Sequence, residues 1–163
     1  MCPRQESYGV YAFDERFIKV TVSGVIMSPK KVKVLIVDDQ EMITELFSAY
    51  FERHGYTNVR TAHCEDSAKE ALLDYNPDVL LMDTQVHPQY GPEIFQTLQK
   101  HGFAGLCYGM SGNKEKDGKD FELDWKKVGA KKFFMKMDIF GLDQFDKKFL
   151  QPMYQDYKSH FSQ

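Results

Sequence analysis

The stretch KVLIVDDQEM, Lys33 to Met42, is the most informative part of the sequence. Its first five residues, Lys33–Val37, form a short apolar run rich in β-branched side chains, which is typical of a strand buried on both faces. Asp38 and Asp39 follow this run directly. Two adjacent carboxylates repel each other and resist removal from water. Their place at the end of a buried strand therefore indicates a site that uses both charges.

Strand and helix patterns alternate along the chain from residue 33 onward. The predicted strands are residues 33–37, 57–62, 78–83, 104–110 and 130–136, and the predicted helices are residues 41–56, 65–75, 92–102, 121–129 and 141–150. This alternation predicts an α/β fold in which a parallel sheet is covered by helices on both faces. Right-handed crossovers then make the five-stranded parallel sheet doubly wound.

The composition is that of an ordinary globular chain of 163 residues, which fits one domain with some extra sequence at the ends. The formal net charge of −3 and the pI of about 5.9 argue against general affinity for nucleic acids or anionic membranes. Cys2, Cys64 and Cys107 form no CxxC pair, which favours free thiols in a reducing compartment. Because no apolar run reaches ~18 residues and no secretory signal is evident, we expect a cytoplasmic protein without a membrane span.

Three carboxylates follow predicted strands at one edge of the sheet. Asp38 and Asp39 come after the first strand, and Asp83 closes the third. Because the carboxyl ends of parallel strands meet at the same edge, we expect these side chains to converge. Clustered carboxylates without a counter-ion are unfavourable. A divalent cation such as Mg²⁺, which binds a few carboxylates plus water, would neutralise them. The sequence therefore predicts a magnesium site.

Two further side chains are expected at the same edge. Ser111 follows the fourth strand and supplies a hydroxyl, and Lys136 ends the fifth strand and supplies a positive charge. Taken singly, a serine before a glycine is usually a turn residue, and a lone lysine is usually solvated. Together with three acids they make a site for phosphoryl chemistry.

These segments closely resemble the receiver domain of two-component response regulators, over roughly residues 31–151. VLIVDD resembles the first strand with its acidic pair, and DVLLMD resembles the strand that carries the phosphoryl acceptor. YGMSG supplies the hydroxyl, and GAKKFFMK resembles the strand that carries the lysine. Gly91, eight residues after Asp83, falls where the family usually has glycine. The resemblance implies a flavodoxin-like receiver fold.

The resemblance also implies a role for each acidic residue. Asp83 is expected to accept a phosphoryl group and form an aspartyl phosphate. Asp39 and Asp83 are expected to bind Mg²⁺ directly, together with the backbone carbonyl of Gln85. Asp38 is expected to hold metal-bound water. At most, this implies self-phosphorylation from phosphohistidine or small donors and self-dephosphorylation, so enzyme activity in the ordinary sense is uncertain.

The switch residues are likewise expectations from the resemblance. Lys136 is expected to pair with the phosphoryl oxygens, and Ser111 to donate a hydrogen bond to one of them. Phe133, three residues before the lysine, is expected to swing inward when the hydroxyl moves. The alternative for Phe133 is an ordinary core aromatic.

The sequence departs from the family at three places. His87 stands where members usually have proline, and it is either close enough to the phosphoryl group to make dephosphorylation pH-sensitive or a solvated loop residue. Met137 rather than proline follows Lys136. The charged, glycine-punctuated segment 112–120 predicts a mobile loop before a shortened helix.

The two ends of the chain lie outside the expected receiver domain. Residues 1–30 are an N-terminal extension that is either unfolded, an added strand around residues 18–22, or sequence upstream of a true start at Met27. Residues 152–163 are a C-terminal tail that either forms a short packed helix or frays. No DNA-binding output domain is expected in this length.

We therefore expect a single-domain response regulator that receives phosphoryl groups from a histidine kinase or phosphotransfer protein. It would signal by contact with a downstream protein that the sequence does not name. The alternative is a receiver-like binding module that works without phosphorylation. A metal-dependent phosphatase is a third class, but it needs an acid–base residue beyond Asp83, and only His87 is available.

Overall fold

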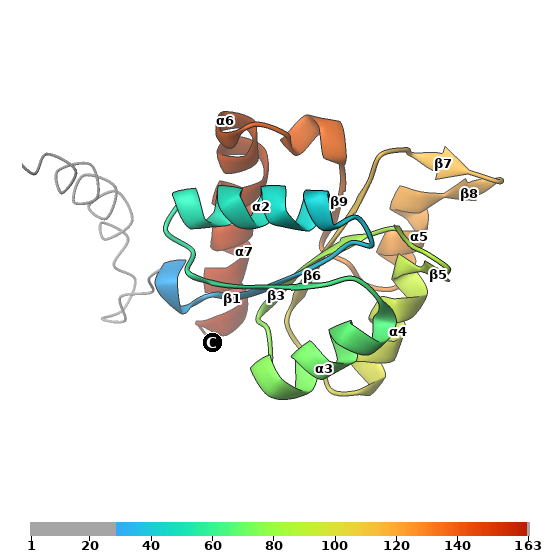
Figure 1. Cartoon of the computed structure of the whole chain (residues 1–163), viewed down its shortest axis with the longest axis horizontal. Helices are drawn as coiled ribbons and strands as arrows, with labels where there is room; N and C mark the ends of the chain where they lie inside the picture. The colour runs from blue at the N-terminus through green and yellow to red at the C-terminus, as the bar shows by residue number, and fades with distance from the viewer. Residues whose placement is uncertain (1–28, 163) are drawn as a thin grey trace, which may run out of the picture.

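The computed structural model describes residues 29–162 (Figure 1). Its five main strands are β1 (Lys33–Val37), β2 (Asn58–Ala62), β3 (Val79–Asp83), β6 (Leu106–Ser111) and β9 (Lys132–Met135). All neighbouring pairs are parallel, and the order in the sheet is β2-β1-β3-β6-β9. The chain thus moves to one edge and then crosses to the other, so the predicted doubly wound parallel sheet is confirmed.

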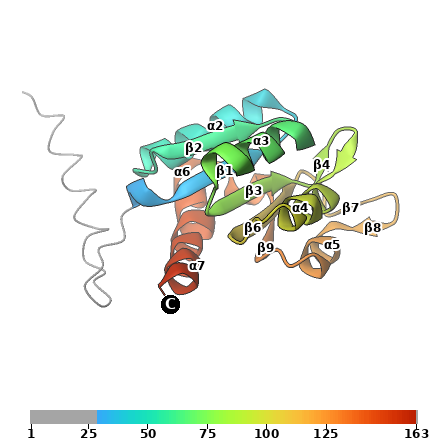
Figure 2. The ribbon, with the colours of Figure 1, turned by 90° about the horizontal axis from the view of Figure 1, so that it is seen from below.

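Helices cover both faces of this sheet (Figures 1 and 2). One layer contains α2 (Glu41–Arg53), α6 (Leu142–Gln144) and α7 (Gln151–Phe161), and the other contains α3 (Glu65–Tyr75), α4 (Gly91–Lys100) and α5 (Phe121–Lys127). Short 3-10 helices, η1 (Pro29–Lys31) and η2 (Lys136–Ile139), precede β1 and follow β9. None of the helices between residues 29 and 162 is long and apolar enough to cross a bilayer.

Each face of the sheet has its own hydrophobic core. The core under α2 and α7 is rich in aromatic rings, namely Phe47, Phe51, Tyr56, Tyr108, Phe134, Phe145, Phe149, Tyr154 and Tyr157. The core under α3, α4 and α5 is mainly aliphatic and includes Trp125. Because both faces are covered, every residue of β3 is buried, including the terminal Asp83. Burial on both faces explains why this strand reads as a continuous apolar run.

The C-terminal helical region is longer than the sequence predicted. A helix over 141–150 and a separate tail were expected, whereas α6, the π-helix η3 (Phe145–Leu150) and α7 follow one another without a gap. Pro152 has no N–H for the α-helical ladder, and the adjoining Gln151 N–H bonds to the Asp146 carbonyl five residues back. Because α7 buries several apolar side chains in the aromatic core, the packed helix is the correct alternative for the tail.

Two short hairpins extend from the carboxyl ends of the strands. The first joins β4 (Gln85–Val86) to β5 (Gln89–Tyr90) through a cis His87–Pro88 bond, and the second joins β7 (Glu115–Lys116) to β8 (Lys119–Asp120). The second replaces the mobile loop predicted over 112–120. Asp117 and Gly118 both have positive φ, as a type I′ turn requires. The predicted shortened helix follows as the seven-residue α5.

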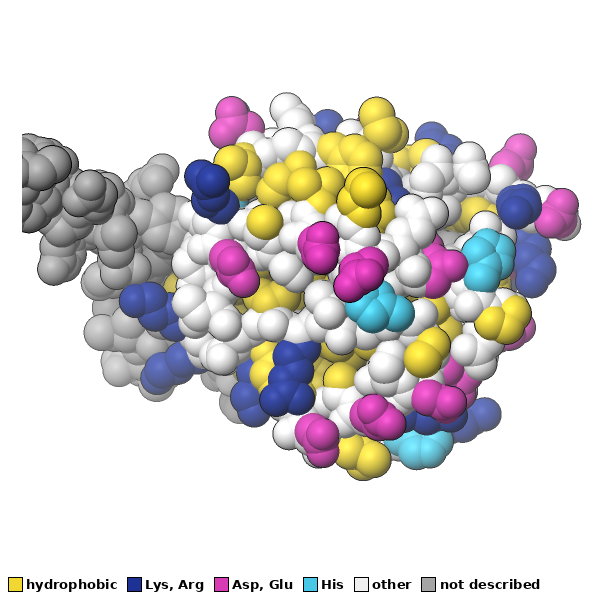
Figure 3. All heavy atoms as spheres, viewed as in Figure 1, with side chains coloured by type: hydrophobic (Ala, Val, Ile, Leu, Met, Phe, Trp, Pro, Cys, Tyr) yellow, Lys and Arg dark blue, Asp and Glu magenta, His cyan; other side chains and the backbone are white. Residues whose placement is uncertain are grey.

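The predictions for the N-terminal extension, including the strand at 18–22 and the start at Met27, lie outside the described residues. On the face shown in Figure 3, acidic and basic side chains are interspersed among neutral and hydrophobic ones. This mixed surface is in keeping with the small net charge of −3.

Candidate functional site

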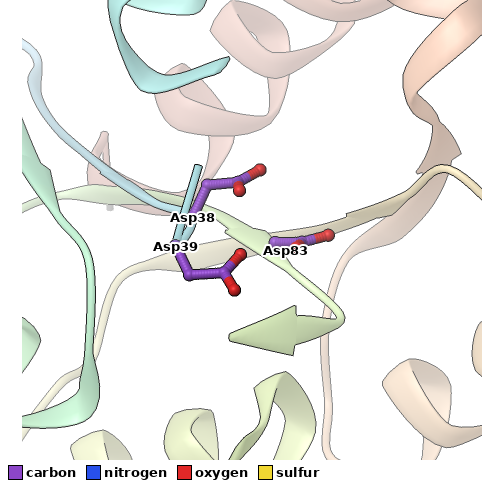
Figure 4. A group of neighbouring side chains, drawn as sticks. All are labelled: Asp38, Asp39 and Asp83. Atoms are coloured by element: carbon purple, nitrogen blue, oxygen red, sulfur yellow. The ribbon is translucent and has the colours of Figure 1, made fainter. Parts of the chain in front are cut away.

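Three carboxylates converge at the carboxyl ends of β1 and β3 (Figure 4). Asp38 and Asp39 follow β1 directly, and Asp83 is the last residue of β3, the parallel neighbour of β1. One carboxylate oxygen from each residue lies within 4.8 Å of the others. Figure 4 shows the three side chains pointing to the same side of the strands. The predicted convergence is thus present in the structure, because adjacent parallel strands end side by side.

Lys136 places its ammonium group between two of these acids. Its Nζ lies 2.7 Å from Asp38 Oδ2 and 3.2 Å from Asp83 Oδ1. The lysine is only 8% exposed and follows β9, so its side chain reaches past the end of β6 to the acids. Lys136 therefore pairs with two of the three carboxylates, and acids outnumber bases in the cluster.

The protonation of these groups reflects burial and repulsion. The pKa of Asp83 is raised to about 7, chiefly by burial and then by the Asp38 charge, against the opposing effect of Lys136. Burial also raises the pKa of Asp38. Burial alone would lower the pKa of Lys136, but the charges and hydrogen bonds of Asp83 and Asp38 outweigh it and raise that pKa. Such an acid-rich set of oxygen ligands suits a divalent cation such as Mg²⁺.

Ser111 and Phe133 flank the acidic cluster on the side of β6 and β9. Ser111 is the buried last residue of β6, and its Oγ accepts a hydrogen bond from the Asn113 N–H at 3.1 Å. Phe133 is half-buried in β9 and packs against the core that contains Trp125. It also lines a surface hollow of about 500 Å³ beside β9. The roles of both residues in switching stay predictions.

The hairpin after Asp83 contacts the acidic cluster through its backbone. The His87 N–H donates to Asp39 Oδ2 at 3.3 Å, while His87 itself is exposed. Gln85 is half-buried at the start of this hairpin, two residues after Asp83. The binding of a metal by its carbonyl stays a prediction.

The structure adds three residues that the sequence did not single out. His63 places Nδ1 3.0 Å from the Asp38 carbonyl. Thr84, next to Asp83, accepts a 2.9 Å hydrogen bond from the indole N–H of Trp125. The last two residues are 41 positions apart, so only the fold brings them together. The one feature of the sequence that could have drawn attention to this contact is that Trp125 is the single tryptophan.

The fold and this cluster together define the chain as a receiver domain. Over residues 34–141 it matches the family described as the response regulator receiver domain, and it belongs to that family. It is similar to the polar-differentiation response regulator DivK of Brucella ovis, with 31% identity over 93 residues that cover 51% of this chain and 72% of DivK.

Solved structures share this fold. The chemotaxis protein CheY4 of Vibrio cholerae superposes with a TM-score of 0.63 and 21% identity, covering 74% of this chain and 97% of CheY4. A chain of the CheX–CheY–BeF3–Mg²⁺ complex from Borrelia burgdorferi superposes with a TM-score of 0.63 and 21% identity, covering 77% of this chain and 89% of that one. At this level of identity the comparison concerns the fold.

Proposed function

We propose that this receiver domain accepts a phosphoryl group on Asp83 in a Mg²⁺-dependent reaction and signals by phosphorylation-dependent contact with another protein. The observation that carries the proposal is the buried Lys136, which is ion-paired to both Asp38 and Asp83 beside a third carboxylate. A structural salt bridge needs one acid and one base. The excess of acids here favours a site that binds a cation and then an anion.

The acidic residues would hold the metal. Asp39, Asp83 and the Gln85 carbonyl would bind Mg²⁺ directly, and Asp38 would act through a bound water. The ion supplies positive charge that lets an anionic donor approach an anionic carboxylate. The CheX–CheY complex from Borrelia burgdorferi contains Mg²⁺ and BeF3, which supports the proposal of a Mg²⁺ site in this chain.

The reaction would be nucleophilic attack by the Asp83 carboxylate on the phosphorus of a phosphohistidine in a histidine kinase or phosphotransfer protein. An O–P bond forms, the P–N bond breaks, and the imidazole leaves with the bonding electron pair and takes up a proton. Lys136 Nζ, already 3.2 Å from Asp83, is placed to pair with the phosphoryl oxygens. Hydrolysis by water would return the carboxylate, so the chain would also dephosphorylate itself.

Signalling would start from the new charge. A phosphoryl group adds about −1.5 to −2 charges and three strong hydrogen-bond acceptors. Ser111, at the end of β6, would donate to one of them, and Phe133 would follow the movement. The surface that changes would lie along β9, where Phe133 lines the hollow of about 500 Å³. A cytoplasmic partner protein would recognise that change.

The test is intact-mass spectrometry after incubation with acetyl phosphate and Mg²⁺, with Asp83→Asn as the control. One added phosphoryl group on the parent and none on the variant is the expected result. Absence of an adduct on the parent after rapid quenching, together with no response of the fold to beryllofluoride, would instead support the phosphorylation-independent binding module.

A further inference from the structure

Helix α5 is joined at two points to the loop that follows β3, residues 84–90, which we term the acceptor loop. At the start of the loop, the Trp125 indole N–H donates to Thr84 Oγ1 at 2.9 Å. At its end, the Tyr90 hydroxyl donates to Asp124 Oδ2 at 2.8 Å. Since Asp124 and Trp125 are adjacent on α5, one turn of one helix holds both ends of the acceptor loop.

The first of these points is buried and its hydrogen bonding is complete. Thr84 is fully buried, and its hydroxyl donates to the Met110 carbonyl at 2.8 Å while accepting from Trp125. The Thr84 N–H donates to the same carbonyl at 2.8 Å and lies 3.0 Å from Asp83 Oδ1. Trp125 therefore holds a residue that itself contacts the carboxylate of Asp83.

Two glycines make the space in which the Trp125 ring lies. A Cβ atom at Gly109 would lie 2.5 Å from atoms of the indole, and one at Gly91 would lie 2.9 Å from it. Trp125 is fully buried. Because the ring is enclosed by the backbone of β6 and the start of α4, α5 has little freedom to slide past the acceptor loop.

The second point also involves the β7–β8 hairpin. The Tyr90 ring lies 6.0 Å from the ring of Phe121 on α5, and Lys119 Nζ of β8 lies 4.1 Å from the centroid of Tyr90. Figures 1 and 2 show the two hairpins at the same end of the molecule. The β7–β8 hairpin follows Ser111, so the segments after the proposed acceptor and after the proposed switch hydroxyl meet at Tyr90.

We propose that Trp125 is a positioning residue for Asp83, acting through Thr84, and that α5 and the acceptor loop move as one unit. The strength of this link would set how firmly the carboxylate is held and how long a phosphoryl group survives on it. Only this effect on lifetime rests on the proposed function.

Hydrogen-exchange mass spectrometry of the full, unphosphorylated chain tests the link between the two segments. Trp125→Phe keeps a ring and removes the indole N–H, and Thr84→Val removes the hydroxyl with little change in shape. Trp125→Phe is expected to raise exchange in residues 84–90 and 121–127 together by about fivefold, as loss of one hydrogen bond predicts. Thr84→Val should raise it at least as much, because the Thr84 hydroxyl also donates to the Met110 carbonyl. The double variant should exceed Thr84→Val by little, because Thr84→Val already removes the acceptor of the Trp125 bond together with the bond to the Met110 carbonyl.

Tyr108→Phe is the matched control, because it removes a phenol–carboxylate hydrogen bond to Asp156 of 2.7 Å on the opposite layer. It should leave exchange in both segments unchanged. A rise in only one of the two segments in Trp125→Phe and Thr84→Val, or in neither, would overturn the proposal.

The lifetime of the phosphoryl group tests the positioning role. After acetyl phosphate is removed, Trp125→Phe should lose the adduct about fivefold faster than the parent, and Thr84→Val should lose it at least as fast as Trp125→Phe. Tyr108→Phe should match the parent. Lifetimes within about twofold of the parent in both variants would contradict the role of Trp125. No adduct on the parent would contradict the proposed function and the lifetime effect. The hydrogen-exchange comparison would then be the only test of the link between α5 and the acceptor loop.

Discussion

Two neighbouring regions at the carboxyl ends of the strands satisfy their polar groups in opposite ways. In the acidic cluster, three carboxylates lie together and the ammonium group of Lys136 pairs with two of them, Asp38 and Asp83. In the region beside it, the Thr84 hydroxyl has both a donor, Trp125, and an acceptor, the Met110 carbonyl. The charged region has more acids than bases, as the proposed Mg²⁺ site requires, whereas the hydrogen bonds of the neutral region are made within the chain. In our proposals, the acidic cluster binds the ligand, and the neutral region positions the loop that follows Asp83.

The largest expected effect comes from the charge of Asp83 in the absence of metal. Its pKa is raised to about 7 in the folded protein, against about 3.9 in the unfolded chain. The folded state therefore binds the proton more tightly, and this stability, present below about pH 4, is lost as the pH rises through about 7. The free energy of unfolding should fall by up to about 4 kcal/mol over that range.

Asp83→Asn should remove most of this fall, because the amide does not ionise. Urea unfolding at about pH 5 and about pH 8 without Mg²⁺ measures the difference between parent and variant. If the stabilities of parent and variant change in parallel with pH, the raised pKa of Asp83 in the folded protein would be contradicted. Saturating Mg²⁺ should stabilise the parent more than the variant.

The next effect concerns the metal. Replacing both Asp38 and Asp39 with asparagine should lower the initial rate of phosphoryl uptake from acetyl phosphate by about 100-fold at limiting Mg²⁺, since the charges that hold the ion are lost. Intact-mass spectrometry at several Mg²⁺ concentrations measures the rate. Glu41→Gln is the control, because it removes an exposed acid just outside the cluster. Phosphoryl uptake by the double variant at the parental rate would contradict the assignment of Asp38 and Asp39 to the Mg²⁺ site.

A smaller effect is expected from crowding the neutral region. Gly109→Ala would bring a methyl group to 2.5 Å from the indole of Trp125, which is buried and unable to retreat. We expect a loss of about 2 kcal/mol in the free energy of unfolding. Gly112→Ala is the control, because nothing lies within 4 Å of its Cβ position. Equal stabilities of the two variants would contradict the close packing of the Trp125 indole against Gly109.

The smallest effect separates paired from unpaired buried hydroxyls. The Tyr56 hydroxyl is buried with no hydrogen-bond partner among the described residues, whereas the Tyr108 hydroxyl donates to Asp156 at 2.7 Å. Tyr56→Phe should therefore stabilise the chain by about 1 kcal/mol, and Tyr108→Phe should destabilise it by a similar amount. Thermal unfolding of both variants measures the sign, and the same sign for both would contradict the distinction.

Much of the fold and of the acidic cluster was accessible from the sequence. Alternating apolar runs and helical patterns predicted the parallel sheet, because strands buried on both faces must be apolar throughout. Once the strands were placed, Asp38, Asp83 and Lys136 had to lie at the same edge. Strand ends are local features, and the topology of the sheet turns them directly into a spatial cluster.

The remaining features depend on contacts between distant residues. The sequence left open whether the C-terminal tail packs as a helix or frays, and the contacts of α7 with the aromatic core decide for the helix. The β7–β8 hairpin carries the turn signal Asp117-Gly118, yet its flanking residues are charged rather than alternating, so a loop was predicted. The Trp125–Thr84 bond joins residues 41 positions apart and has no local signature.

The most direct test of the central proposal is to locate the phosphoryl group. The parent would be incubated with acetyl phosphate and Mg²⁺, and borohydride would then reduce any acyl phosphate to the corresponding alcohol. Tandem mass spectrometry should find homoserine in place of Asp83, and only in the sample that contained Mg²⁺. Homoserine at another acidic residue, or none in a sample that remained folded, would contradict the assignment of Asp83 as the acceptor.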